Sequence, residues 1–223
     1  GITEKGYARS LSDSVKLPAT LDENFKGIPN TNRRETMRLS REMMYAGMAW
    51  YKKEVTIPEN WKGKCIRLMI ERTKPTHVWV DTVLIGSNND LLTPQYYDLS
   101  TKLTPGKHII TILVNNGNGS VPEGVTGSHA WMEHTQSNWN GVIGKFSLEA
   151  SNTTHIENVQ VYPDVEKKKV LVKVKIYSTR GISEKLNISL QANAWNTEVK
   201  HKVSPISLPR NSEGRRKYCG TYL

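Results

Sequence analysis

The feature that most constrains the fold is an alternation of apolar and polar residues with a period of two, which is typical of strands with one buried face. It recurs along the chain at residues 66–70, 77–80, 110–114, 146–150, 170–176 and 186–192. Turn-forming sequences, such as those at 104–107 and 116–119, fall between these runs. Short strands at this spacing predict an all-β chain built as a sandwich or jelly roll.

One segment has a pattern that fits a helix as well as a strand. Within residues 33–44, Met37, Arg41 and Met44 fall at helical spacing. The run that follows at 45–51 predicts a strand, which favours an extended conformation over a helix in the preceding segment.

A short polar stretch divides the sequence into two parts. Ser151, Asn152, Thr153 and Thr154 separate the strand ending at Ala150 from the next one at 156–162. We therefore predict two β-domains, 1–150 and 151–223. The first has the length of a full jelly roll. The second falls short of the roughly 100 residues of an immunoglobulin-like sandwich, so we expect it to be truncated and to leave a strand edge unpaired.

The net charge of +10 raises the question of a nucleic-acid partner. The excess lies in the second part, which holds 13 of the 31 Lys and Arg but only 6 of the 21 Asp and Glu. There Lys173 and Lys175 alternate with apolar residues, a pattern that favours the solvated face of a strand over a phosphate-binding surface. We expect no nucleic-acid partner. No run of about 18 apolar residues occurs, so no membrane span is predicted.

The residues that most often carry catalysis or bind metals form no familiar pattern. Cys65 and Cys219 lie far apart and are expected to be isolated thiols. His129 and His134 lack a third ligand at zinc-binding spacing. The carboxylates are scattered along strands and give no reason to expect the paired acids of a glycosidase. Neither a metal nor a cofactor is predicted.

The segment 127–141 differs from the rest of the chain in its residue types. It contains two Trp, two His, one Gln and two Asn within fifteen residues. Sugars are bound by this mixture, because an aromatic ring packs on the apolar side of a pyranose while amides and imidazoles reach its hydroxyl groups. The same residues would serve equally well as core aromatics and turn caps. The Asn115-Asn116 pair has the same two interpretations.

A series of longer motifs follows in order between about Leu17 and Ile176. They lie at 45–58, 61–64, 78–81, 85–86, 97–100 and 103–108. Together they closely resemble the N-terminal sugar-binding jelly roll of glycoside hydrolase family 2. Residues 138–144 resemble the motif that closes this domain in the β-galactosidases of gut Bacteroides. Residues 156–165 resemble the entry into the immunoglobulin-like second domain of that family.

The resemblance implies a galactose-binding-like jelly roll over 1–150 and an immunoglobulin-like β-sandwich, which we expect to be truncated, over 151–223. In the family the chemistry belongs to a third domain, a (β/α)₈ barrel with an Asn-Glu acid/base. No Asn-Glu dipeptide occurs in this sequence. We therefore expect this chain to be an inactive, accessory part of a larger glycosidase.

The resemblance also implies which residues contact a glycan or the catalytic barrel. They are Asn115, Asn116, His134, Gln136, Asn138, Trp139 and Asn140. The expected partners are a glycoside and the barrel, and the expected location is the periplasm or the cell exterior. The alternative is a purely structural or adhesive pair of sandwiches in which the aromatic loop contacts another protein domain.

Overall fold

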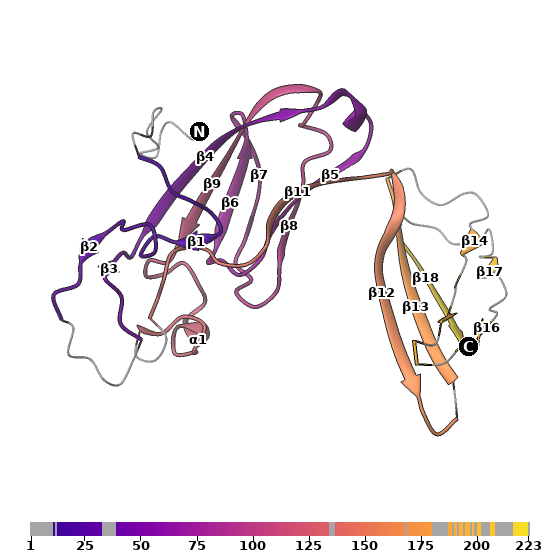
Figure 1. Ribbon diagram of the computed structural model, residues 1–223. Coiled ribbons are helices and arrows are strands. Elements are labelled where there is room, and N and C mark those ends of the chain that lie inside the picture. Colours follow the sequence, from indigo (N-terminus) through magenta and orange to yellow (C-terminus); the bar gives the residue numbers. More distant parts are fainter. Residues whose placement is uncertain are drawn as a thin grey trace. The chain divides into compact units, whose positions relative to one another are not determined.

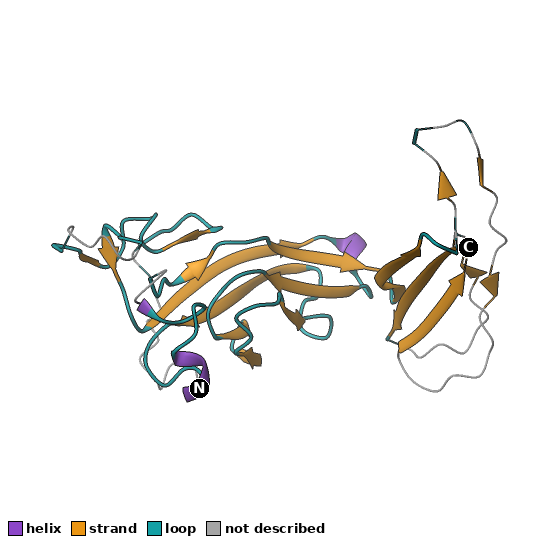
Figure 2. Ribbon diagram, turned by 90° about the horizontal axis from the view of Figure 1, so that it is seen from below, coloured by secondary structure: helices purple, strands orange, loops and turns teal. Residues whose placement is uncertain are grey.

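The computed structural model describes residues 11, 13–32, 39–133, 137–167, 169–179, 187–188, 190, 192–193, 195–196, 198, 200–201, 206–207 and 216–222. The chain divides into two compact units, Gly1–Ala150 and Ser151–Leu223. Strands dominate both of them (Figures 1 and 2). The helices of the described part are a 3₁₀ turn, Glu59–Trp61, and α1, Glu123–Thr126. Neither of them is long enough to cross a membrane. The prediction of an all-β chain is confirmed.

The larger sheet of unit 1 is antiparallel and has the strand order β4-β9-β6-β7. Its strands are β4 (Met48–Ile57), β9 (Gly106–Asn115), β6 (Thr76–Val80) and β7 (Val83–Asn88). The two long strands pair along their whole length, from Met48 opposite Asn115 to Ile57 opposite Gly106. This register sets the loop after Asn115 beside the chain that enters β4 at Met48.

A second sheet has the order β11-β5-β8, formed by β11 (Phe146–Ser151), β5 (Cys65–Ile70) and β8 (Gln95–Asp98). Both sheets contribute to one apolar core, as the alternation predicted. The core includes Ile57, Ile66, Leu68, Ile70, Val78, Val80, Tyr97, Ile110, Ile112 and Val114. Unit 1 is therefore a β-sandwich. Cys65 is buried and its thiol is free, as expected.

Unit 1 also contains two short antiparallel strand pairs. One joins β1 (Ala19–Thr20) to β10 (Gly141–Val142), and the other joins β2 (Ile28–Pro29) to β3 (Met43–Met44). Gly141 has a φ of +135°, and a Cβ there would lie 2.4 Å from the carbonyl oxygen of Ala19. Only glycine fits this close approach. Of the segment 33–44, residues 43–44 are extended, while 33–38 lie outside the described residues.

Unit 2 contains a sheet of order β12-β13-β18. Its strands are β12 (Thr154–Asp164), β13 (Lys169–Ser178) and β18 (Arg216–Tyr222). Two short pairs accompany it: β14 (Asn187–Ile188) with β17 (Ile206–Ser207), and β15 (Ala192–Asn193) with β16 (Lys200–His201). A small core gathers Val172, Val174, Ile176 and Ile188. An immunoglobulin-like sandwich remains a prediction for this unit.

The apolar face of this sheet is covered only in part. On β13, Val172, Val174 and Ile176 are 3–6% exposed. Their cross-strand partners on β12 are Val161, Val159 and Ile156, which are 49–59% exposed. Residues paired across an antiparallel sheet share one face, so the buried layer of β13 continues into an exposed aliphatic stripe on β12.

Candidate functional site: an amide network and a buried lysine

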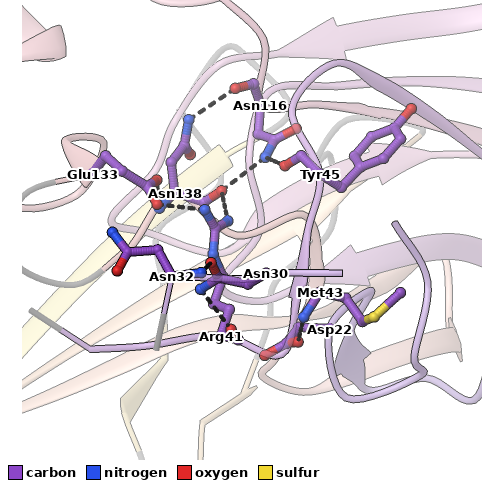
Figure 3. A network of polar contacts seen from close by, with 9 residues as sticks. All are labelled: Asp22, Asn30, Asn32, Arg41, Met43, Tyr45, Asn116, Glu133 and Asn138. Carbon is purple, nitrogen blue, oxygen red and sulfur yellow. Dashed lines mark hydrogen bonds and ion pairs between the residues drawn. The ribbon is translucent and has the colours of Figure 1, made fainter. Parts of the chain in front are cut away.

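The candidate site lies where β9 ends, beside the entry into β4. It is built around Asn116, whose side chain is 1% exposed. The Asn116 Oδ1 accepts a hydrogen bond from the backbone N–H of Gly47 at 2.9 Å. Its Nδ2 donates to the carbonyl oxygens of Tyr45 and Asn138, at 2.8 and 2.9 Å (Figure 3). Asn116 thus ties three segments together by bonding to a backbone group of each one.

Asn140 is a second buried amide in the same network, at 2% exposure. Its Nδ2 donates to the Val114 carbonyl oxygen at 3.0 Å and to the Asn116 Oδ1 at 3.1 Å. Its Oδ1 accepts a hydrogen bond from the Tyr51 hydroxyl at 3.0 Å. Burial raises the pKa of Tyr51, so this phenol remains a donor. The amide therefore joins the loop 137–141 to the interior of the larger sheet.

Asn138 lies nearer the surface and is held on both sides. Its Nδ2 donates to the Asn116 carbonyl oxygen at 2.8 Å, and its backbone N–H donates to the Glu133 Oε2 at 2.7 Å. The Arg41 guanidinium, 10% exposed, pairs with Glu133 and donates to the Asn138 carbonyl oxygen at 2.9 Å (Figure 3). The Asn138 Oδ1 is buried and accepts no hydrogen bond within the described part of the chain.

Lys74 is the residue that the sequence did not single out. Its side chain is 2% exposed, and its Nζ donates to the carbonyl oxygen of Ala130 at 2.7 Å. The same Nζ lies over two indole rings, 5.0 Å from the centroid of Trp131 and 4.8 Å from that of Trp139. Burial lowers the pKa of Lys74 to about 8. The Glu133 carboxylate opposes this shift and Arg41 adds to it.

The seven residues expected at the site have different environments. Asn116 and Asn140 are buried and bonded inside the unit, whereas Asn138 and Trp139 are partly exposed, and Trp139 lies against the Lys74 ammonium. Asn115 ends β9 and accepts a hydrogen bond from the Gly117 N–H at 2.9 Å, as a turn residue does. His134 and Gln136 lie outside the described residues.

The described network has few groups that would carry out chemistry. Its carboxylates are committed: Glu133 pairs with Arg41, and Asp22 accepts a hydrogen bond from the Met43 N–H. Among the residues that the structure describes, no group of three or more His, Cys, Asp or Glu side chains is placed to hold a metal ion. The described network thus holds the side chain of Trp139 near the surface. It does not contain the pair of carboxylates that a glycosidase uses to cleave a bond.

Comparisons with known proteins agree with this fold. No protein-family profile matches the chain. Among solved structures, a glycosyl hydrolase family 2 member from Bacteroides cellulosilyticus matches with a TM-score of 0.69 and 19% identity, over 98% of this chain and 28% of that one. A Bacteroides fragilis protein assigned as a β-galactosidase matches with a TM-score of 0.73 and 16% identity, over 95% of this chain and 30% of that one.

A β-glucuronidase of glycoside hydrolase family 2 matches with a TM-score of 0.69 and 20% identity, over 98% of this chain and 24% of that one. The chain thus spans between about a quarter and a third of the length of these enzymes. At such identities the likeness concerns the fold. This chain has the sandwich fold found in glycoside hydrolases of family 2, as its motifs predicted.

Proposed function

We propose that this chain is the non-catalytic, carbohydrate-contacting and scaffold portion of a β-galactosidase-like enzyme of glycoside hydrolase family 2. The observation that carries the proposal is the position of Trp139. This indole is partly exposed, it lies against the Lys74 ammonium, and it stands between Asn138 and Asn140. A partly exposed indole ring is suited to pack on the apolar C–H side of a sugar.

The buried amides support this proposal through rigidity. Asn116 and Asn140 fix the loop 137–141 from inside, so the indole needs little ordering when a ligand binds. The buried Asn138 Oδ1 lacks a donor among the described groups, and an internal water is suited to supply one. One partly exposed ring is a small contact surface, so we expect the affinity of this chain alone to be weak.

The partners follow from the same proposal. In a longer enzyme a (β/α)₈ barrel cleaves the glycosidic bond, and this chain supplies a wall of the sugar site and braces the barrel. The proposal is supported by the enzymes that share the fold and by the fraction of their length that this chain spans. We further propose a periplasmic or secreted location.

One observation favours the alternative, a purely structural or adhesive protein. The side-chain amides of Asn116 and Asn140 already have hydrogen-bond partners inside unit 1, which is typical of residues with a structural role. In that case the exposed side of Trp139 contacts another protein domain, and no glycan binds.

Titration of the chain with galactosides and glucuronides, followed by NMR or calorimetry, distinguishes these two functions. We expect weak saturable binding that Trp139→Ala abolishes. Trp195→Ala is the matched control, because Trp195 is 95% exposed and belongs to unit 2. If no glycan gives saturation at millimolar concentration, or if both variants bind like the wild type, Trp139 is not a sugar contact.

A further inference from the structure

Lys74 has an environment that is uncommon for a buried lysine. Such residues usually pair with a carboxylate, but here the nearby Glu133 is bonded to Arg41 and to the Asn138 N–H. The Lys74 ammonium is left with one carbonyl oxygen and the faces of two indole rings. Within the described residues, its contacts are therefore directed at the aromatic loop.

The two ends of Lys74 belong to different parts of unit 1. Its backbone is fixed: its carbonyl oxygen accepts a hydrogen bond from the Gln95 Nε2, and the adjacent Thr73 donates to the Gly141 carbonyl oxygen at 2.8 Å. Its Nζ reaches Ala130 in the loop that follows α1. Lys74 thus connects the rigid end of the sheet to a loop distant in sequence.

We propose that Lys74 is the positioning residue of this site: its ammonium, held between the rings of Trp131 and Trp139, fixes the orientation in which Trp139 faces the ligand. Trp131 is 5% exposed and serves as the fixed side of this arrangement, while Trp139 is the partly exposed side. The ligand in question is the glycan of the proposed function, on which this part of the inference rests. The positioning of the ring itself can be measured without any ligand.

A consequence of the proposal is dependence on pH. An ammonium is attracted to a ring face, whereas a neutral amine is not. Because burial lowers the pKa of Lys74 to about 8, the attraction is present below this pH and is lost above it. Two charged groups lie near the Lys74 ammonium. Glu133 belongs to the loop that contains Ala130, and Arg41 belongs to the segment before β3. These two groups form an ion pair with each other.

Fluorine NMR of the chain labelled with 5-fluorotryptophan tests the positioning directly. The six Trp residues give separate signals, and Trp131→Phe and Trp139→Phe identify the two that matter. Between pH 6.5 and 9.5 we expect both signals to shift with a common midpoint near 8. The signal of Trp61, which packs against the core of unit 1, is expected to stay constant.

Lysine variants then assign the transition. Lys74→Met should abolish it, and Lys74→Arg should abolish it while keeping the low-pH position of the Trp139 signal, because arginine stays charged at pH 9.5. Lys53→Met is the matched control at an exposed position and should titrate like the wild type. The proposal is overturned if the wild-type signals of Trp131 and Trp139 do not move, or if the transition persists in Lys74→Arg. The wild-type titration decides the matter even if Lys74→Met fails to fold.

Glycan titration of the same variants separates the two proposals. If the wild type binds a glycan, Lys74→Met should lower the affinity for that glycan by about tenfold. Lys74→Arg should lower the affinity by much less. If the pH transition is present but no glycan binds, the positioning role stands and the proposed function fails. If glycan binds and the transition is absent, the proposed function stands and the positioning role fails.

Discussion

Replacement of Asn116 by Ala tests the claim that the amide network holds the site together. The change removes four hydrogen bonds: one from the Gly47 N–H, two to the carbonyl oxygens of Tyr45 and Asn138, and one from the Asn140 Nδ2. Two of the freed groups keep other partners, since the Asn138 carbonyl oxygen still accepts from Arg41 and the Asn140 Nδ2 still donates to the sheet. The Gly47 N–H and the Tyr45 carbonyl oxygen lose their side-chain partner.

A buried polar group left without a partner costs about 1–3 kcal/mol. Two such groups, both in half-buried residues, lower the free energy of unfolding of unit 1 by about 3 kcal/mol. Asn115→Ala is the matched control. That side chain accepts a single turn hydrogen bond and should cost only about 0.5–1 kcal/mol.

The assay must report on unit 1 alone, because a chain with two units need not unfold in one step. Fluorine NMR signals of Trp50 and Trp79, both in the larger sheet, meet this requirement during urea unfolding. We expect the midpoint of Asn116→Ala to fall well below that of Asn115→Ala. Equal midpoints would refute the reasoning, because the network would then contribute no more than an ordinary turn residue.

Three further predictions concern other parts of the chain. Gly141→Ala should destabilise unit 1 in a thermal melt, since its Cβ would lie 2.4 Å from the Ala19 carbonyl oxygen, whereas Gly124→Ala meets open space and should be neutral. Burial acts to raise the pKa of Asp81, but hydrogen bonds from a backbone N–H and a histidine outweigh it and lower the value. The small stabilisation by Asp81 is therefore present above the pKa of the unfolded state, about 4, and is lost as the pH falls through the folded pKa. When the free energy of unfolding is measured as the pH is lowered, Asp81→Asn should therefore not show this loss of stability. Val161→Lys should reduce the fluorescence of a bound hydrophobic dye, because it interrupts the exposed stripe of β12, whereas a lysine placed on the polar face of that strand should leave the signal unchanged.

The strands were predictable because their signal is local. Alternation at 66–70, 77–80 and 110–114 predicts β5, β6 and the second half of β9, and the structure places the apolar positions of these runs in one core. A period of two requires no knowledge of distant residues, since each strand must bury one face whatever it pairs with.

The site was predictable only in part. Asn116 and Asn140 were predicted to contact a glycan or the catalytic barrel, and that role stays a prediction, while the structure shows them as bonded amides of one buried network. An Asn in a loop bonds to backbone or faces solvent with similar ease, and the sequence does not distinguish these cases. Lys74 gave no signal at all. Its contact with Ala130 spans 56 positions, and a lysine between strands has the same sequence pattern whether it is buried or solvated. Contacts of this kind depend on the completed fold.

The pairing of β1 with β10 also determines when unit 1 can be completed during synthesis. Ala19 pairs with Val142, and the Leu21 N–H donates to the Asn140 carbonyl oxygen, so the partners of this early segment leave the ribosome much later. At about 5–20 residues per second, the delay is roughly 6 to 25 s. The sheet β4-β9-β6-β7 is complete in sequence at Asn115 and can form first. The amide network therefore assembles late in the folding of unit 1, on a sheet that already exists.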